Sequence, residues 1–219
     1  MLLSIIRQNQ KLAAKRNPAF DRNRFAKFLI YFMVAFWAAY LIFIGVMLSF
    51  AFEDIFPSME PYHIMNQGLI YLLILDFLLR FMLQPAMSQE IKPYLLMPVK
   101  KNKLVDTLLL QSGISRYNFF WFFLIIPFAL LTIIRFYGLT GILCYLCGIW
   151  LLMVMNSYWY LICKTLLNEK LLYILLPIGV YGLLAGTEFI PEGNPVSTFM
   201  MNLGEGFIEG NILAFPGVI

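Results

Sequence analysis

The sequence has little charge and very few of the residues that build catalytic centres. Of 219 residues, 13% are charged and one is a histidine, His63, whereas 61% are hydrophobic. A soluble domain usually carries about 25% charged residues. A membrane enzyme needs acids or histidines that converge at one depth, and here they are scattered. We therefore expect no enzymatic activity, no catalytic residue and no cofactor, and we interpret His63 as an ordinary surface residue.

Cysteine is also scarce. The three cysteines lie within or at the end of one apolar stretch, at Cys144, Cys147 and Cys163. This placement excludes the disulfide framework of a small secreted protein. The first two form a C-x-x-C pair with no second pair and no nearby histidine or acid, so we interpret all three as packing residues and predict no metal site.

Phosphate-binding motifs are missing as well. No G-x-x-x-x-G-K-[ST] sequence occurs, so any ATP hydrolysis would need a separate protein. The glycines Gly204, Gly206 and Gly210 follow no predicted strand and do not indicate a nucleotide site. The net charge of +4 comes from short basic segments between apolar runs, without the aromatic interleaving of a nucleic-acid surface. Anionic lipid headgroups are the expected neighbours of these segments, not nucleic acid.

Long apolar runs dominate the chain instead, and each is a candidate membrane-spanning helix. The sequence predicts five spans, at residues 25–52, 69–87, 119–136, 142–162 and 171–184. The turn Tyr137-Gly138-Leu139-Thr140-Gly141 joins the third and fourth, and Pro177 predicts a kink in the fifth. The aromatic clusters at 118–123 and 158–160 are interpreted as belts at span ends. The expected fold is an all-α polytopic bundle over residues 23–186.

Three further segments complete the predicted organisation. Residues 1–22 alternate apolar and basic positions, which is typical of an interfacial helix without a cleavable signal peptide. Residues 53–68 contain acids and two prolines but no lysine or arginine, and they predict an exterior loop. The tail 187–219 also has no basic residue. Its part 196–215 is interrupted by glycines, so it predicts either a re-entrant segment or a sixth span.

The distribution of basic residues predicts the orientation, because lysine and arginine collect on the cytoplasmic side of span ends. With the N-terminus in the cytoplasm, the basic residues of 7–27, 92–103, 116, 164 and 170 all lie inside. Only Arg135 lies near the outer surface. We therefore expect an integral protein of a bacterial inner membrane with a cytoplasmic N-terminus.

The connection at 88–117 carries an amphipathic helix. Asn102 is a suitable N-cap and Gly113 lies near the end. The apolar side is predicted to comprise Leu104, Val105, Leu108 and Leu109, and the polar side Lys103, Asp106 and Gln111, with Lys100 and Lys101 at the start.

Two polar positions lie within predicted spans. Asp76 and Arg80 stand four apart on one helical face. Intramembrane charges usually have a role, but this pair also has the spacing for simple mutual neutralisation. Asn156, in the fourth span, could line a polar path or bond to a neighbouring helix.

The order of these parts resembles the permease subunit of type-2 ABC exporters: an interfacial helix, two spans, a cytoplasmic amphipathic helix, then further spans and an outer re-entrant region. The stretch PYLLMPVKKNKLVDTLLLQSGISRYN, residues 93–118, is also similar to a loop in bacterial membrane proteins described as ABC permeases. Such permeases normally finish with another span, whereas this sequence finishes in a loop-like Phe215-Pro216-Gly217, as a piece of a longer chain would.

The resemblance implies a function and a set of partners. A cytoplasmic ATP-binding cassette ATPase would receive the 100–111 helix in a groove, and a second permease chain would complete the transporter. The implied ATPase contacts are Lys100, Lys101, Lys103, Leu104, Val105, Leu108 and Leu109. The substrate would be apolar or a lipid. Two other hypotheses stay open: a non-transporting scaffold of a membrane complex and, with less support from the residues, a lipid-modifying enzyme that uses His63 or Asp76.

Overall fold

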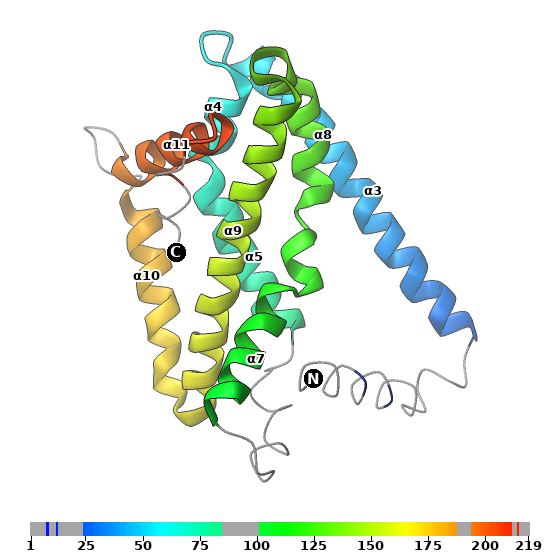
Figure 1. Ribbon diagram of the computed structural model, residues 1–219, viewed down its shortest axis with the longest axis vertical. Helices are drawn as coiled ribbons and strands as arrows, with labels where there is room; N and C mark the ends of the chain where they lie inside the picture. Colours follow the sequence, from blue (N-terminus) through cyan, green and yellow to red (C-terminus); the bar gives the residue numbers. More distant parts are fainter. Residues whose placement is uncertain are drawn as a thin grey trace.

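The computed structural model describes residues 24–84, 101–187 and 194–211, together with Gln8, Leu12 and Ala214. Within these ranges every regular element is a helix, so the predicted all-α fold is confirmed for this part of the chain. Helices α3, α5, α8, α9 and α10 run along the long axis, and α11 lies across one end (Figure 1). The predicted interfacial helix at 1–22 falls almost entirely outside the described residues.

Helix α3, Arg24–Ile55, matches the first predicted span. Its buried positions follow a four-residue spacing, Leu41, Gly45 and Ser49, which places them on one side of the helix. That side packs against α8, Phe122–Thr132. A Cβ atom at Gly45 would collide with the backbone carbonyl of Leu124, so glycine is what allows the two backbones to approach closely. The N-terminal half of α3 diverges from the bundle (Figure 1).

Helix α9, Ile134–Glu169, forms the centre of the molecule. Its buried residues, among them Tyr145, Ile149 and Met153, recur every three or four positions and face the other helices. Gly138 interrupts the helix with φ 62° and ψ −161°, a conformation that residues with a Cβ atom rarely adopt. The predicted reversal of the chain at 137–141 is therefore confirmed.

The segment predicted as an exterior loop contains a helix, which corrects the prediction for 53–68. Helix α4, Pro61–Gln67, begins at a proline in its first turn, and its residues Tyr62, Met65 and Asn66 are buried. These side chains pack on α11 and α8, so apolar contacts far along the chain decide the local structure. Helix α5, Leu69–Leu83, follows at a bend of 49°. It ends four residues before the predicted boundary, because Gln84 is extended.

Helix α11, Pro195–Ile208, occupies most of the segment 196–215, for which the sequence left a re-entrant segment and a sixth span open. Asn194 caps its first turn, and Gly204 and Gly206 lie inside the helix instead of breaking it. At 14 residues the helix is about 21 Å long, shorter than the roughly 30 Å hydrocarbon core of a bilayer. It is therefore too short to form a sixth span by itself.

Two helical segments of the described chain, Phe28–Ile55 and Ile134–Glu169, are long and apolar enough to cross a membrane. The number rises to four if each of two bent helix pairs counts as one span, α4 with α5 and 102–119 with α8. The 3₁₀ turn Leu171–Ile174 and helix α10, Leu175–Gly186, are apolar but shorter. Pro177 lies in the first turn of α10, where a missing N–H breaks no helical bond, and not at a mid-helix kink. These lengths fit a membrane protein.

Candidate functional site

A buried ion pair lies in the second half of α5. The Nε of Arg80 donates to Oδ2 of Asp76 at 2.6 Å, and the two side chains are 0% and 4% exposed. The spacing of four residues on one helix brings the groups together. The structure therefore shows the ion pair that the four-residue spacing allows, and both side chains are buried inside the protein.

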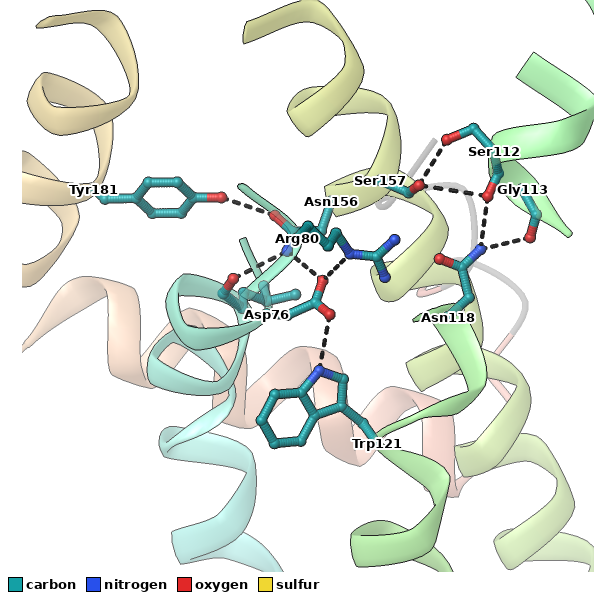
Figure 2. Close-up of polar contacts among 10 residues, drawn as sticks. Asp76, Arg80, Ser112, Gly113, Asn118, Trp121, Asn156, Ser157 and Tyr181 are labelled. Atoms are coloured by element: carbon teal, nitrogen blue, oxygen red, sulfur yellow. Dashed lines mark hydrogen bonds and ion pairs between the residues drawn. The ribbon is translucent and has the colours of Figure 1, made fainter. Parts of the chain in front are cut away.

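Two more donors reach the Asp76 carboxylate from other parts of the bundle (Figure 2). The indole Nε1 of Trp121 donates to Oδ1 at 2.8 Å, and Nδ2 of Asn156 donates to Oδ2 at 2.7 Å. Nδ2 of Asn156 also donates to the Leu73 carbonyl at 2.9 Å, and its Oδ1 accepts from the Tyr181 hydroxyl at 2.7 Å. We call Asp76, Arg80, Trp121, Asn156 and Tyr181 the core polar cluster.

The core polar cluster joins four parts of the bundle. Its members come from α5, from the residue that precedes α8, from α9 and from α10. Each carboxylate oxygen accepts from at least one donor, which is the arrangement that a buried charge requires. Of the two roles that the sequence left open for Asn156, the structure shows the hydrogen bonds to neighbouring helices. The cluster fixes the relative positions of helices that are far apart in the chain.

A second polar group connects α7, Lys101–Gly113, to α9. The hydroxyls of Ser112 and Ser157 lie 2.7 Å apart. Asn118, in the 3₁₀ turn Arg116–Phe119, donates from Nδ2 to the carbonyls of Ser112 at 3.1 Å and Gly113 at 2.5 Å. We call Ser112, Gly113, Asn118 and Ser157 the α7 anchor. It attaches the end of α7 to the helix that also supplies Asn156.

The structure separates the predicted ATPase-contact residues of α7. Leu104 is 4% exposed and packs inward, whereas Val105 is 53% and Leu109 38% exposed. Lys103 is also exposed. Lys100 lies outside the described residues, as do the side chains of Lys101 and Leu108. Two further apolar side chains, Leu110 at 56% and Ile114 at 53%, extend the exposed surface.

His63, interpreted from the sequence as an ordinary surface residue, has a specific partner. Its Nδ1 lies 2.5 Å from Oε1 of Glu205, and each side chain is 29% exposed. Close by, the Tyr145 hydroxyl donates to Oδ1 of Asn66 at 2.9 Å. The contacts tie α4 to α11 and α9. The sequence could not reveal the first pair because 142 positions separate the two residues.

Sequence reasoning also missed Trp121 and Tyr160, which it assigned to aromatic belts. Trp121 is 4% exposed and Tyr160 0%, and the Tyr160 hydroxyl donates to the Gln84 carbonyl at 2.7 Å. The sequence feature that could have indicated these contacts is the polar atom on each ring, because that atom needs a hydrogen-bond partner when the ring is buried. Within the described ranges the three cysteines are free, and no group of three or more histidines, cysteines or acids could hold a metal ion.

Comparison with known proteins gives one finding for the chain. Residues 10–219 match DUF5687, which is described as a family of unknown function. No curated protein and no solved structure matches.

Proposed function

We propose that this chain, which belongs to the DUF5687 family, is a membrane-spanning transport subunit that works with a separate cytoplasmic ATPase. The observation that carries the proposal is the position of α7. One side of this helix is held to the bundle by Leu104 and the α7 anchor, and another side exposes apolar residues next to charges. A helix that is attached to the bundle on one side and to a partner on the other can transmit a movement of the partner to the bundle.

The proposal includes five spans with a cytoplasmic N-terminus. Successive spans would be α3, α4 with α5, α8, α9, and the 3₁₀ turn 171–174 with α10. Figure 1 supports this order, because the chain reverses direction along the long axis from each of these units to the next. The end that carries α7 also carries Lys103, Arg116 and Lys170, as the preference for cytoplasmic basic residues requires.

The exposed surface of α7 is the proposed ATPase contact. Val105, Leu109, Leu110 and Ile114 provide apolar contact area, with Lys103 and Asp106 beside them. Because the sequence has no Walker A motif, the energy of ATP would have to come from the partner. A second permease chain and an apolar or lipid substrate belong to the same proposal, as does a bacterial inner membrane.

The ATPase contact can be tested by copurification from cells that express the neighbouring genes. The double variant V105D/L109D should insert into the membrane but lose a P-loop ATPase that the wild-type protein retains. The control M59D places one aspartate at an exposed apolar residue in the turn before α4, far along the chain from α7, and should retain the ATPase. Wild-type protein that never copurifies with a P-loop ATPase would count against the proposal.

A scaffold without transport activity is the second candidate. A stacked aromatic row on α3 favours it, because Phe28, Phe32, Phe36 and Tyr40 present one continuous exposed face. Such a face could hold another membrane protein. A scaffold predicts complexes whose composition does not change on adding ATP and Mg²⁺, whereas an ATP-driven transporter predicts that nucleotide alters the association or conformation of its partner.

A further inference from the structure

Six side chains carry buried hydrogen-bonding groups with no partner among the described residues, those of Asn66, Arg80, Gln84, Asn118, Trp150 and Trp159. Three of these residues belong to or adjoin the two polar groups described above, through Nη1 and Nη2 of Arg80, Nε2 and Oε1 of Gln84, and Oδ1 of Asn118. The residues are 0%, 4% and 0% exposed. An unpaired polar group inside a protein is costly, and most costly where a membrane excludes bulk water. Something that both donates and accepts hydrogen bonds would remove that cost.

The orientation of the Asn118 amide is set by its own contacts. Its Nδ2 donates to two carbonyls, those of Ser112 and Gly113, so its Oδ1 is necessarily the free acceptor. The orientation of Arg80 is set in the same way, because its Nε is held by Asp76 and both Nη atoms extend beyond the carboxylate. In Figure 2 the guanidinium of Arg80 and the oxygen of Asn118 point toward one another.

We propose that bound water occupies the region between Arg80 and Asn118 and links them. A water molecule accepts from an Nη of Arg80 and donates to Oδ1 of Asn118. The side chain of Gln84, one helical turn after Arg80, offers a donor and an acceptor to the same water or to a second one. Buried waters commonly make about three hydrogen bonds of this kind.

The charges and acceptors favour water over an anion. The Asp76 carboxylate already compensates the charge of Arg80, so the pair has no net positive charge to attract a free anion. An anion would also face the fixed acceptor on Asn118, which can only repel it. A cation would face the guanidinium. Water satisfies both sides because it donates and accepts.

The bound water has a structural consequence. It joins the core polar cluster to the α7 anchor by hydrogen bonds between side chains, in addition to the chain neighbours Asn156 and Ser157 on α9 and the nearby Asn118 and Trp121. The network then runs without a break from Tyr181 on α10 to the end of α7. This inference does not depend on what the chain transports, and its test uses no transport assay.

The direct test is a structure of the protein in lipid nanodiscs at a resolution that shows ordered water. We expect density within hydrogen-bonding distance, about 2.7–3.2 Å, of an Nη of Arg80 and of Oδ1 of Asn118. The variant N118L should lose that density and keep the Asp76–Arg80 pair. A direct Arg80–Asn118 hydrogen bond, or empty space between them in the wild-type map, would overturn the proposal even if N118L fails to fold.

Thermal unfolding separates water from an anion. The Tm of the wild-type protein should change by less than about 1 °C when chloride is replaced by acetate or gluconate at constant ionic strength, because no anion binds. A rise of several degrees with one small anion, absent in R80K, would show that the site takes an anion and would contradict the proposal.

Discussion

Asp76 and Arg80 hold opposite charges one helical turn apart, where neither is exposed. Such a pair affects stability mainly when one member is removed, because the remaining charge then stays buried without a compensating charge. Three donors converge on Asp76, so its loss would also leave Trp121 and Asn156 without an acceptor. Losing Asp76 would therefore disturb three buried contacts at once.

Substituting D76L should lower the free energy of unfolding by about 3–5 kcal/mol, because it leaves the Arg80 charge buried alone. The double variant D76L/R80M should recover much of that loss. The control R135A removes a pair with Glu53 that is 63% and 54% exposed, and it should cost less than about 1 kcal/mol. Unfolding followed by circular dichroism in detergent would measure all three. Equal losses for D76L and R135A would contradict this ranking.

Glycine positions offer a second test of packing. A Cβ atom at Gly148 would collide with the ring of Phe207, which is 0% exposed and enclosed by neighbours. G148A should therefore destabilise the protein by about 1–3 kcal/mol. At Gly182 in α10 nothing lies within 4 Å of the added atom, so G182A should be neutral or raise stability by up to about 1 kcal/mol. The same unfolding assay compares the two variants, and a neutral G148A would show that α11 packs differently.

The sequence revealed one contact of the core polar cluster and concealed the others. The Asp76–Arg80 spacing was sufficient to predict the pair, because both residues belong to one helix. Trp121 and Tyr181 come from other helices, and no local pattern identifies an acceptor 45 or 25 positions away. Residues that pair across the bundle need the tertiary arrangement to be recognised.

Helix α11 is held by buried apolar side chains more than by the partly exposed contact between His63 and Glu205. Phe207 and Ile208 are 0% and 2% exposed, whereas His63 and Glu205 are each 29% exposed. The variant F207A should remove contacts worth about 3–5 kcal/mol and detach the helix. Its amides at 199–208 should then exchange with solvent roughly a hundredfold faster or more.

A matched control for α11 is E205Q, which removes one charge but leaves an oxygen that can accept from His63. Its amide exchange should stay within about threefold of the wild-type rate, because a partly exposed polar contact contributes little. Hydrogen exchange with mass spectrometry measures both variants. An effect of E205Q as large as that of F207A would show that the His63–Glu205 contact, and not burial, holds α11.

Helices were predictable where the apolar run was long, as for α3 and α9. They were missed or misjudged where long-range packing decides. Helix α4 forms in a proline-containing segment because Tyr62 and Met65 find buried sites against other helices. Gly204 and Gly206 were interpreted as helix breaks, but within α11 they allow close packing, since a Cβ at Gly204 would meet Asn66. Propensity is a weak guide where tertiary contacts compensate.

The arrangement of the bundle across a bilayer gives the last prediction. In a cysteine-free background, K103C should react with an impermeant maleimide only after the cells are permeabilised. S58C, in the turn before α4, should react in intact cells. Both side chains are exposed, so access depends on sidedness alone. Reaction of K103C in intact cells would reverse the proposed orientation and remove the cytoplasmic ATPase contact with it.

The divergent half of α3 has a mechanical consequence in a bilayer. Its apolar part, Phe28–Ile55, has 28 residues and is about 42 Å long, so it fits a hydrocarbon core of roughly 30 Å only when tilted by about 45°. Contact with α8 begins near Leu41, and the residues before it meet few protein neighbours. A thicker bilayer would therefore reduce the tilt of α3, with the contact near Leu41 as the fixed point. The tilt angle of α3 would then report the thickness of the membrane.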